Sequence, residues 1–175
     1  MVEVDMRTSA HSYSHWRNIP DMVLQECDIT LITFEPGVYG PNTLGSSLDD
    51  RQGTLYIPAS KRGLFEVSGD GVRLRRLELD TGFLRFPIFQ PSSARAEKGY
   101  LDLSTAMEGH GYAQICVVKP SQVKLYRKCW PGLVFFVLPV AAEERGVGAA
   151  RFYIQLLAKQ LCPASFPFYA MVDDR

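Results

Sequence analysis

The stretch that decides the fold runs from residue 112 to residue 172, where apolar strands alternate with helices. It reads YAQICVV (112–118), KPSQVKLYRKCWP (119–131), LVFFVL (133–138), GVGAARFYIQLLAKQL (146–161) and FPFYAMV (166–172). The apolar runs at 112–118 and 133–138 are typical of strands that are covered on both faces, and 166–172 is a third apolar strand. The order strand, helix, strand, helix, strand predicts an α/β fold with a parallel sheet.

The two helices are marked by their ends and by their spacing. In the first, Ser121 is placed as an N-cap and Pro131 stops the helix. In the second, apolar residues at steps of three and four share one face: Val147, Ala150, Ile154, Leu157 and Leu161. We therefore expect each helix to pack on the sheet through an apolar face.

The first part of the chain has a different pattern, which predicts a β-rich unit over residues 1–108 and a second unit over 109–175. Short strand patterns are expected at 28–34, 54–58, 63–67, 72–79 and 83–89. Gly69-Asp70-Gly71 predicts a hairpin turn, and a change of phase at Arg75-Arg76 predicts a bulge. Pro87 favours an edge position for the last of these strands, and Pro91–Lys98 is expected to be a connector.

The composition excludes several classes of protein. The chain has 175 residues, 19 basic and 19 acidic side chains, and 46% hydrophobic residues. Neither general disorder nor a strong nucleic-acid patch is therefore expected. The four cysteines form no C-x-x-C pair, which predicts free buried thiols in an intracellular protein. The longest apolar run, 133–142, is too short for a membrane helix.

The candidate site follows from where parallel strands end, because ligands bind at the carboxyl ends of such strands. The second helix begins Gly146-Val147-Gly148, and its free N–H groups favour an anion. Arg151, one turn further, adds a charge that suits phosphate. Asp173 and Asp174 follow the third strand and suit Mg²⁺ or Mn²⁺ together with phosphate oxygens. The residues thus predict a nucleoside diphosphate bound with a divalent metal ion.

Two other interpretations remain open from the residues. The glycines could belong to a dinucleotide-binding Rossmann domain in which Asp173 holds a ribose. Arg151 opposes this reading, because it stands where that motif has a small residue, and residues 140–145 separate the strand from the glycines. Each site residue also has a plain structural explanation, such as close packing of the helix on the sheet at Gly146 and Gly148.

The block from Tyr126 to Asp174 resembles a known family. Its sequences LVFFVLP, GVGAARFYIQLLA and FPFYAMVDD look like the first half of a GT-A glycosyltransferase fold. The block is similar to the C-terminal glycosyltransferase-like domain of the oestrogen-regulated growth regulator family of breast cancer. That domain is related to the glucosyltransferases that make DNA base J.

This resemblance implies roles for individual residues. Lys119 to Ser121 would lie near the nucleotide, Arg151 near the diphosphate, and Asp173 and Asp174 at the metal. It also implies a nucleotide-sugar donor, a nuclear location and protein partners such as a nuclear receptor, in a hormone-responsive transcription coregulator.

The chain departs from the family pattern at two points. The second strand ends Leu138-Pro139, where many members have an acid that contacts the base, and Glu143 or Glu144 are the candidates to replace it. The chain also stops one residue after the acidic pair, so we expect a fragment that lacks the acceptor half and is inactive alone. A catalytically inactive interaction module is therefore the alternative function.

Overall fold

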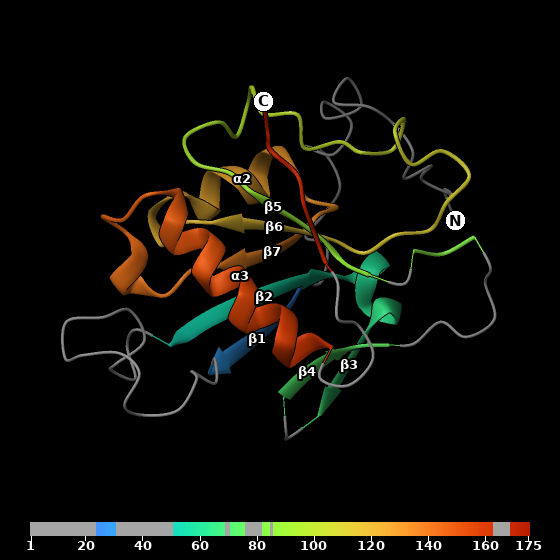
Figure 1. Cartoon of the computed structure of the whole chain (residues 1–175), viewed down its shortest axis with the longest axis horizontal. Coiled ribbons are helices and arrows are strands. Elements are labelled where there is room, and N and C mark those ends of the chain that lie inside the picture. The colour runs from blue at the N-terminus through green and yellow to red at the C-terminus, as the bar shows by residue number, and fades with distance from the viewer. Residues whose placement is uncertain (1–23, 31–50, 69–70, 76–81, 85, 163–168) are drawn as a thin grey trace.

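The computed structural model describes residues 24–30, 51–68, 71–75, 82–84, 86–162 and 169–175, and Figure 1 shows their arrangement. A six-stranded sheet forms the centre, in the order β1-β2-β7-β6-β5-β8, and β3 and β4 form a separate two-stranded sheet. The strands are β1 (Leu24–Thr30), β2 (Gln52–Pro58), β3 (Phe65–Ser68), β4 (Gly71–Leu74), β5 (Ile88–Pro91), β6 (Gln114–Val118), β7 (Val134–Val137) and β8 (Ala170–Met171). The helices are α2 (Val123–Cys129) and α3 (Val147–Leu161), with short 3₁₀ turns η2 (Ala59–Leu64), η3 (Pro120–Gln122) and η4 (Val140–Ala142).

The parallel core confirms the α/β fold expected from the sequence. β7, β6, β5 and β8 all run in the same direction, with β6 between β7 and β5 and with β8 beside β5. On the other side of β7, β2 pairs with it in the antiparallel direction. β1 is likewise antiparallel to β2. The sheet thus takes strands from both sides of residue 108. The expected hairpin is confirmed by the pairing of β3 with β4.

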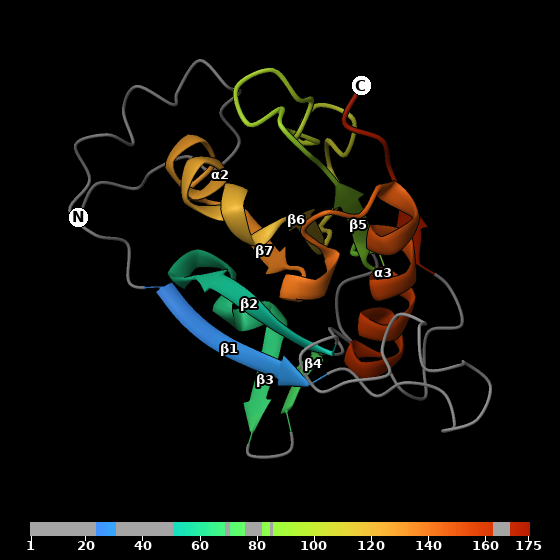
Figure 2. The same ribbon diagram turned by 90° about the vertical axis from the view of Figure 1, so that its left-hand side faces the viewer.

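The two faces of the sheet are covered by different helices, as Figure 2 shows. Ile115 and Val117 of β6 belong to the larger apolar core, which includes the buried side of α3. Cys116 and Val118 point the other way, into the second core with Tyr126 and Cys129 of α2. All five side chains of β6 and all four of β7 are buried, so the prediction that these strands are covered on both faces is confirmed.

The edge position predicted for the strand at 83–89 is wrong. β5 is not at an edge, because it lies between β6 and β8. Pro87 comes just before the strand, so its missing N–H removes no hydrogen bond from the sheet. Its carbonyl oxygen accepts a hydrogen bond from the amide of Ala170. Within the predicted strand 166–172, β8 comprises two described residues and pairs with β5 in the parallel sense, and Met171 is 40% exposed. Expected strand residues 31–34 and 166–168, and the bulge at Arg75-Arg76, involve residues outside the described ranges.

All four cysteines are buried thiols, as expected. Burial raises the pKa of the Cys162 thiol to about 11, and it raises the pKa of Cys116 further, with help from the charge of Asp174. Neither thiol is therefore a nucleophile at neutral pH. None of the helices in the described ranges combines the length and apolarity that a membrane crossing requires.

Candidate functional site

The carboxyl ends of four neighbouring parallel strands meet at one edge of the sheet. Ser92 follows β5, Lys119 follows β6, Leu138 follows β7, and the acidic pair comes after β8. The start of α3 belongs to the same edge, because this helix follows β7 after the connection 138–146, which includes η4. Adjacent strands are about 4.8 Å apart, so this edge spans roughly 14 Å from β7 to β8. The topology thus gathers the predicted residues at one edge.

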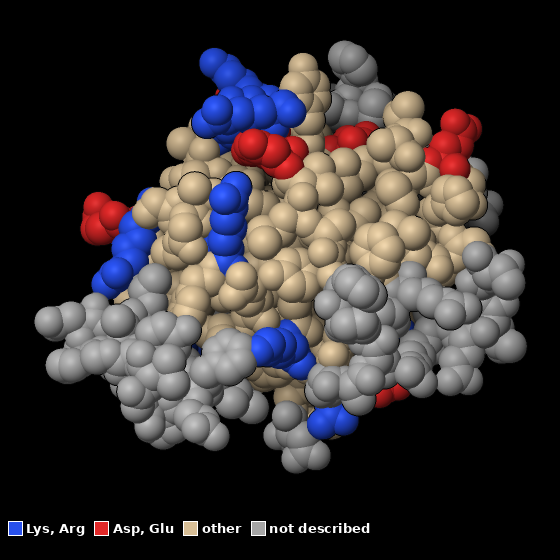
Figure 3. All heavy atoms as spheres, viewed as in Figure 1, with Lys and Arg blue, Asp and Glu red and all other residues tan. Residues whose placement is uncertain are grey.

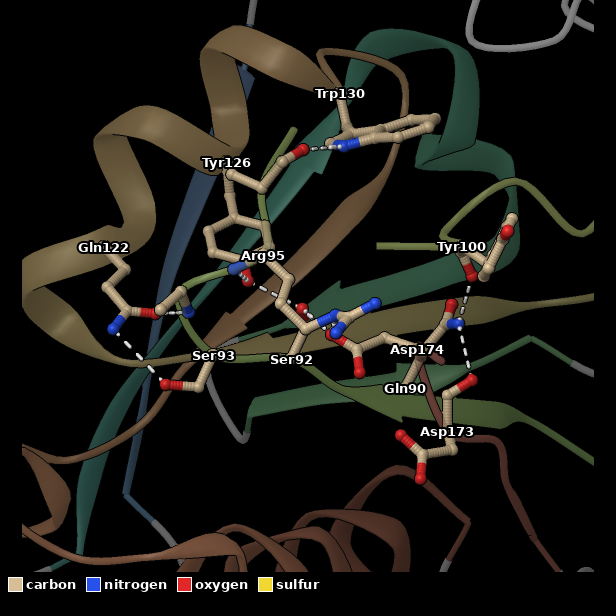
Figure 4. A network of polar contacts seen from close by, with 12 residues as sticks. Gln90, Ser92, Ser93, Arg95, Tyr100, Gln122, Tyr126, Trp130, Asp173 and Asp174 are labelled. Carbon is tan, nitrogen blue, oxygen red and sulfur yellow. Dashed lines mark hydrogen bonds and ion pairs between the residues drawn. The ribbon is translucent and has the colours of Figure 1, made fainter. Parts of the chain in front are cut away.

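The two acids at the end of β8 differ in their surroundings. Asp173 is exposed, whereas Asp174 is only 4% exposed. Neighbouring side chains of an extended chain point to opposite sides, and Figure 4 shows the two carboxylates directed away from each other. The pair is therefore divided into an outward carboxylate and a buried one.

Asp174 is held by groups from two other elements (Figure 4). The hydroxyl of Ser92 donates a hydrogen bond to Asp174 Oδ2 at 2.5 Å, and Arg95 Nε lies 3.5 Å from the same oxygen. The contact with Arg95 is an ion pair and not a hydrogen bond, since Nε has no hydrogen-bond partner. Tyr126 of α2 completes the cluster, with its hydroxyl 2.6 Å from Ser92 Oγ and accepting the amide hydrogen of Arg95 at 3.0 Å.

Tyr126 stays a neutral hydroxyl in this cluster. Burial raises the pKa of Tyr126, and its hydrogen bonds with the hydroxyl of Ser92 and with the amide of Arg95 oppose this only in part. The ring itself packs edge-on against Phe135 at 6.3 Å between centroids. Tyr126 therefore joins the second apolar core to the polar groups of the sheet edge.

A second set of hydrogen bonds ties the loop after β5 to the C-terminal segment. Gln90 Nε2 donates to the carbonyl of Tyr100 at 2.6 Å and to that of Asp173 at 3.4 Å. The amide of Tyr100 donates to the carbonyl of Asp174 at 3.1 Å. Gln114 Nε2 in turn donates to Gln90 Oε1 at 2.7 Å. The acidic pair is thus fixed through its backbone as well as through Asp174.

Lys119 and Ser121 lie together, joined by a partner from the loop after β7. Lys119 Nζ donates to the backbone carbonyl of Glu143 at 2.5 Å, and the amide of Ser121 donates to Glu143 Oε2 at 3.2 Å. The Ser121 hydroxyl donates to Glu143 Oε1. The expected N-cap is therefore wrong: α2 begins after Gln122 without a side-chain cap, because the Ser121 hydroxyl is engaged by Glu143.

The link between Glu143 and Ser121 predicts a pH-dependent contribution to stability. The hydroxyl of Ser121 is the main reason that the pKa of Glu143 is below its ordinary value of 4.5, and the amide of Ser121 and the charge of Lys119 add to it. A carboxylate with a depressed pKa stabilises the fold above its unfolded pKa and loses this effect as the pH falls through the folded pKa. Because Glu143 is only partly buried, solvent screens its contacts, and Glu143→Gln should cost less than about 1 kcal/mol at pH 7. Thermal melts at pH 7 and pH 3 check this, and a difference between the two proteins that persists at pH 3 would contradict it.

The start of α3 is open to solvent. Gly146 and Gly148 are exposed, and a Cβ added to either would meet nothing within 4 Å. The explanation that these glycines allow close packing on the sheet is therefore wrong. The first turn of α3 has no side-chain cap, and Arg151 is exposed one turn further. No contact in the described residues joins Arg151 to Asp173 or Lys119.

Three residues of this edge escaped the sequence analysis: Ser92, Arg95 and Tyr126. Ser92 and Arg95 lie in the segment 91–98, which was expected to be a connector because it is rich in serine and alanine and has mixed charge. The available signal was the apolar pair Ile88-Phe89 running directly into Pro91-Ser92, which resembles the end of a parallel strand. For Tyr126, the apolar spacing of the helix predicted only a position in the core. On the face of the molecule shown in Figure 3, a few basic and acidic side chains are interspersed among other residues, which form most of the described surface.

Comparisons with known proteins give the family. Residues 86–175, just over half of the chain, match the family described as TET-Associated Glycosyltransferase. This range includes β5, β6, β7 and β8 and therefore the whole carboxyl edge.

The similar proteins are much longer than this chain. A GREB1-like protein of Danio rerio is 36% identical over 154 residues, which cover 85% of this chain and 7% of that protein. A GREB1-like protein of Homo sapiens is 36% identical over 156 residues (75% of this chain and 8% of the relative). Protein GREB1 of Homo sapiens is 37% identical over 110 residues (59% and 6%). No solved structure matches the chain.

The resemblance seen in the sequence is thereby confirmed at the level of the family. The match covers the strand ends, the open start of α3 and the divided acidic pair. The chain belongs to the TET-associated glycosyltransferase family, as a domain of the kind found in GREB1-family proteins.

Proposed function

We propose that the carboxyl edge binds a nucleotide-sugar diphosphate together with a divalent metal ion, as the donor half of a GT-A glycosyltransferase site. One observation carries the proposal: in a chain of a glycosyltransferase family, four parallel strand ends and an open helix start converge on one edge. In α/β sheets this edge is where ligands bind.

The residues have distinct tasks in this proposal. The N–H groups at the start of α3 and the exposed guanidinium of Arg151 attract the diphosphate. Gly146 and Gly148 leave room for it, since nothing in the described residues lies where their side chains would be. Lys119 adds positive charge beside Ser121, and their contacts with Glu143 hold the loops after β6 and β7 together.

The carboxylates at this edge suit a divalent ion that phosphate oxygens also bind. Mg²⁺ and Mn²⁺ are commonly held by one or two carboxylates and by substrate phosphates. Asp173 offers an exposed carboxylate, and in the described ranges no three His, Cys, Asp or Glu side chains gather at one point. When bound, such an ion would neutralise charge on the diphosphate.

The proposal also includes the larger protein in which this domain acts and its partner. Since the chain spans 7% of a GREB1-like relative, we propose that it acts as one domain of a larger nuclear, hormone-responsive regulator, with a nuclear receptor as partner. A specific observation favours the alternative of an inactive interaction module: Asp174 is buried in a cluster, and Ser121 is engaged by Glu143.

Calorimetric titration with UDP and Mn²⁺ tests the proposal. UDP should bind the chain about tenfold more tightly with Mn²⁺ than without it, because protein and phosphate oxygens share the ion. Asp173→Asn should remove about tenfold of the affinity in Mn²⁺, and Arg151→Ala about fivefold. Both side chains are exposed, so neither change should disturb folding.

Two exposed residues of the β3–β4 hairpin are the matched controls. Arg73→Ala removes an exposed cation and Glu66→Gln an exposed carboxylate, away from the carboxyl edge. Both should bind UDP as the parent does. Absence of UDP binding by the parent chain would contradict the proposed function and favour the interaction module. Binding that is unchanged by Asp173→Asn and Arg151→Ala would contradict the residue assignment.

A further inference from the structure

The side chain of Glu143 engages both hydrogen-bond donors of Ser121. The amide of Ser121 donates to Glu143 Oε2 at 3.2 Å, and the hydroxyl of Ser121 donates to Glu143 Oε1. Each of these donors has a single hydrogen atom, so it makes one good hydrogen bond at a time. Ser121 can therefore donate to an anionic ligand only after the carboxylate of Glu143 has moved away.

The backbone of Glu143 is fixed independently of this contact. Its amide donates to the carbonyl of Val140 at 3.0 Å, and its own carbonyl accepts from Lys119 Nζ at 2.5 Å. Glu143 is only partly buried and Ser121 is exposed, so solvent reaches the contact between them. Rotation of the Glu143 side chain alone would release Ser121, while Lys119 would still join the loops after β6 and β7.

This contact lies at the carboxyl edge, close to the open start of α3. Lys119 and Ser121 follow β6, and Glu143 is three residues before Gly146, the N-cap of α3. Three residues span at most about 11 Å, so Glu143 is near the place proposed for the diphosphate. A carboxylate and a phosphate repel each other, whereas a phosphate is attracted to Lys119 and accepts from the same donors of Ser121.

We propose that Glu143 makes an autoinhibitory contact: its carboxylate occupies the donors of Ser121, and a phosphate group of the nucleotide-sugar donor displaces it. This inference rests on the proposed function and adds a regulatory step to the same site. Lys119 has two further N–H groups, with which it donates to the phosphate while it keeps its bond to the backbone of Glu143. The contact between Glu143 and Ser121 then belongs to the regulation of the site and is no sign of an inactive domain.

The expected effect on affinity is opposite to that of losing a ligand contact. A ligand that must displace an internal group binds more weakly, in proportion to the fraction of molecules in which the site is open. Because the contact is exposed and therefore weak, we expect this fraction to be about one third. Glu143→Gln and Glu143→Ala should thus each bind UDP about threefold more tightly, since both variants keep the backbone carbonyl that Lys119 holds.

Calorimetric titration with UDP in the presence of Mn²⁺ measures this gain. Glu144→Gln is the matched control, because it removes the same charge from the next residue, whose side chain is exposed. This control should bind UDP as the parent does. Uridine, which lacks the phosphates, should bind Glu143→Gln no more tightly than it binds the parent.

A second measurement locates the displaced contact at Ser121. Ser121→Ala should weaken UDP binding about threefold in the Glu143→Gln background, where the hydroxyl is available to the phosphate. In the parent it should change the affinity little, because the same substitution also removes the hydroxyl that holds Glu143. Amide hydrogen exchange gives a readout that does not depend on affinity: the amide of Ser121 should exchange faster in Glu143→Ala than in the parent, and UDP should slow it again.

The outcomes separate this inference from the proposed function. Unchanged or weaker UDP binding in both Glu143 variants would overturn the inference and leave the proposed function intact. Equal gains in Glu143→Gln and Glu144→Gln would also overturn it, because general charge repulsion would then account for the gain. A gain with uridine would overturn it as well, since a phosphate would not be the displacing group. If neither the parent nor Glu143→Ala binds UDP, the proposed function fails and the inference fails with it.

Discussion

Gly53→Ala is expected to lower the free energy of unfolding by about 3 kcal/mol. Gly53 is buried in β2, next to the junction with β7. A Cβ at this position would lie 2.6 Å from two ring atoms of Phe136 and 2.8 Å from the backbone carbonyl of Val137. The ring of Phe136 is fully buried and the carbonyl belongs to the sheet, so neither has room to move away.

A loss of this size should appear as a melting temperature lower by about 6 to 12 °C. Gly63→Ala is the matched control, because a Cβ at Gly63 would meet nothing within 4 Å in the described structure. Thermal melts of the two variants beside the parent give the comparison. Equal melting temperatures for both variants would show that β2 does not pack against β7 as closely as described.

Arg95→Gln is expected to destabilise the fold by about 2 kcal/mol. Removing one partner of a buried ion pair leaves the other charge uncompensated, which costs about 3 to 5 kcal/mol when both groups are buried. The side chain of Asp174 is 6% exposed, but that of Arg95 is 37% exposed, so solvent screens part of the interaction. The effect should therefore be lower than in a fully buried pair and still clearly measurable.

The pair Arg75–Glu66 on the hairpin provides the control. Its atoms are 3.8 Å apart, and the two side chains are 51% and 61% exposed. Arg75→Gln should therefore change stability by less than about 0.5 kcal/mol. Urea unfolding of both variants at low and high salt measures the difference. Equal losses in the two variants would show that Asp174 is better solvated than its burial indicates.

Much of the parallel core could be predicted from the sequence, because its signals are local. The apolar runs at 112–118 and 133–138 became β6 and β7, buried on both faces. The three-and-four spacing of α3 predicted its buried side, where Ala150, Ile154 and Leu157 lie. Val147 is an exception, since the open start of the helix leaves it 57% exposed.

The place of β5 could not be predicted, because it depends on partners far along the chain. Four residues with a proline just before them carry little periodicity, and their central position results from pairing with β6 and β8. This error concealed the loop that supplies Ser92 and Arg95. The cluster around Asp174 was hidden for the same reason, since its hydrogen bonds join residues that are 31 to 82 positions apart in the sequence.

Paramagnetic relaxation by Mn²⁺ tests the central claim most directly, because it locates the ion beside the backbone. In the isotope-labelled chain with UDP present, added Mn²⁺ should broaden the amide signals of Asp173 and of the start of α3 first. Asp173→Asn should remove this effect. Strongest broadening at the β3–β4 hairpin, or equal broadening throughout the chain, would contradict a nucleotide–metal site at the carboxyl edge.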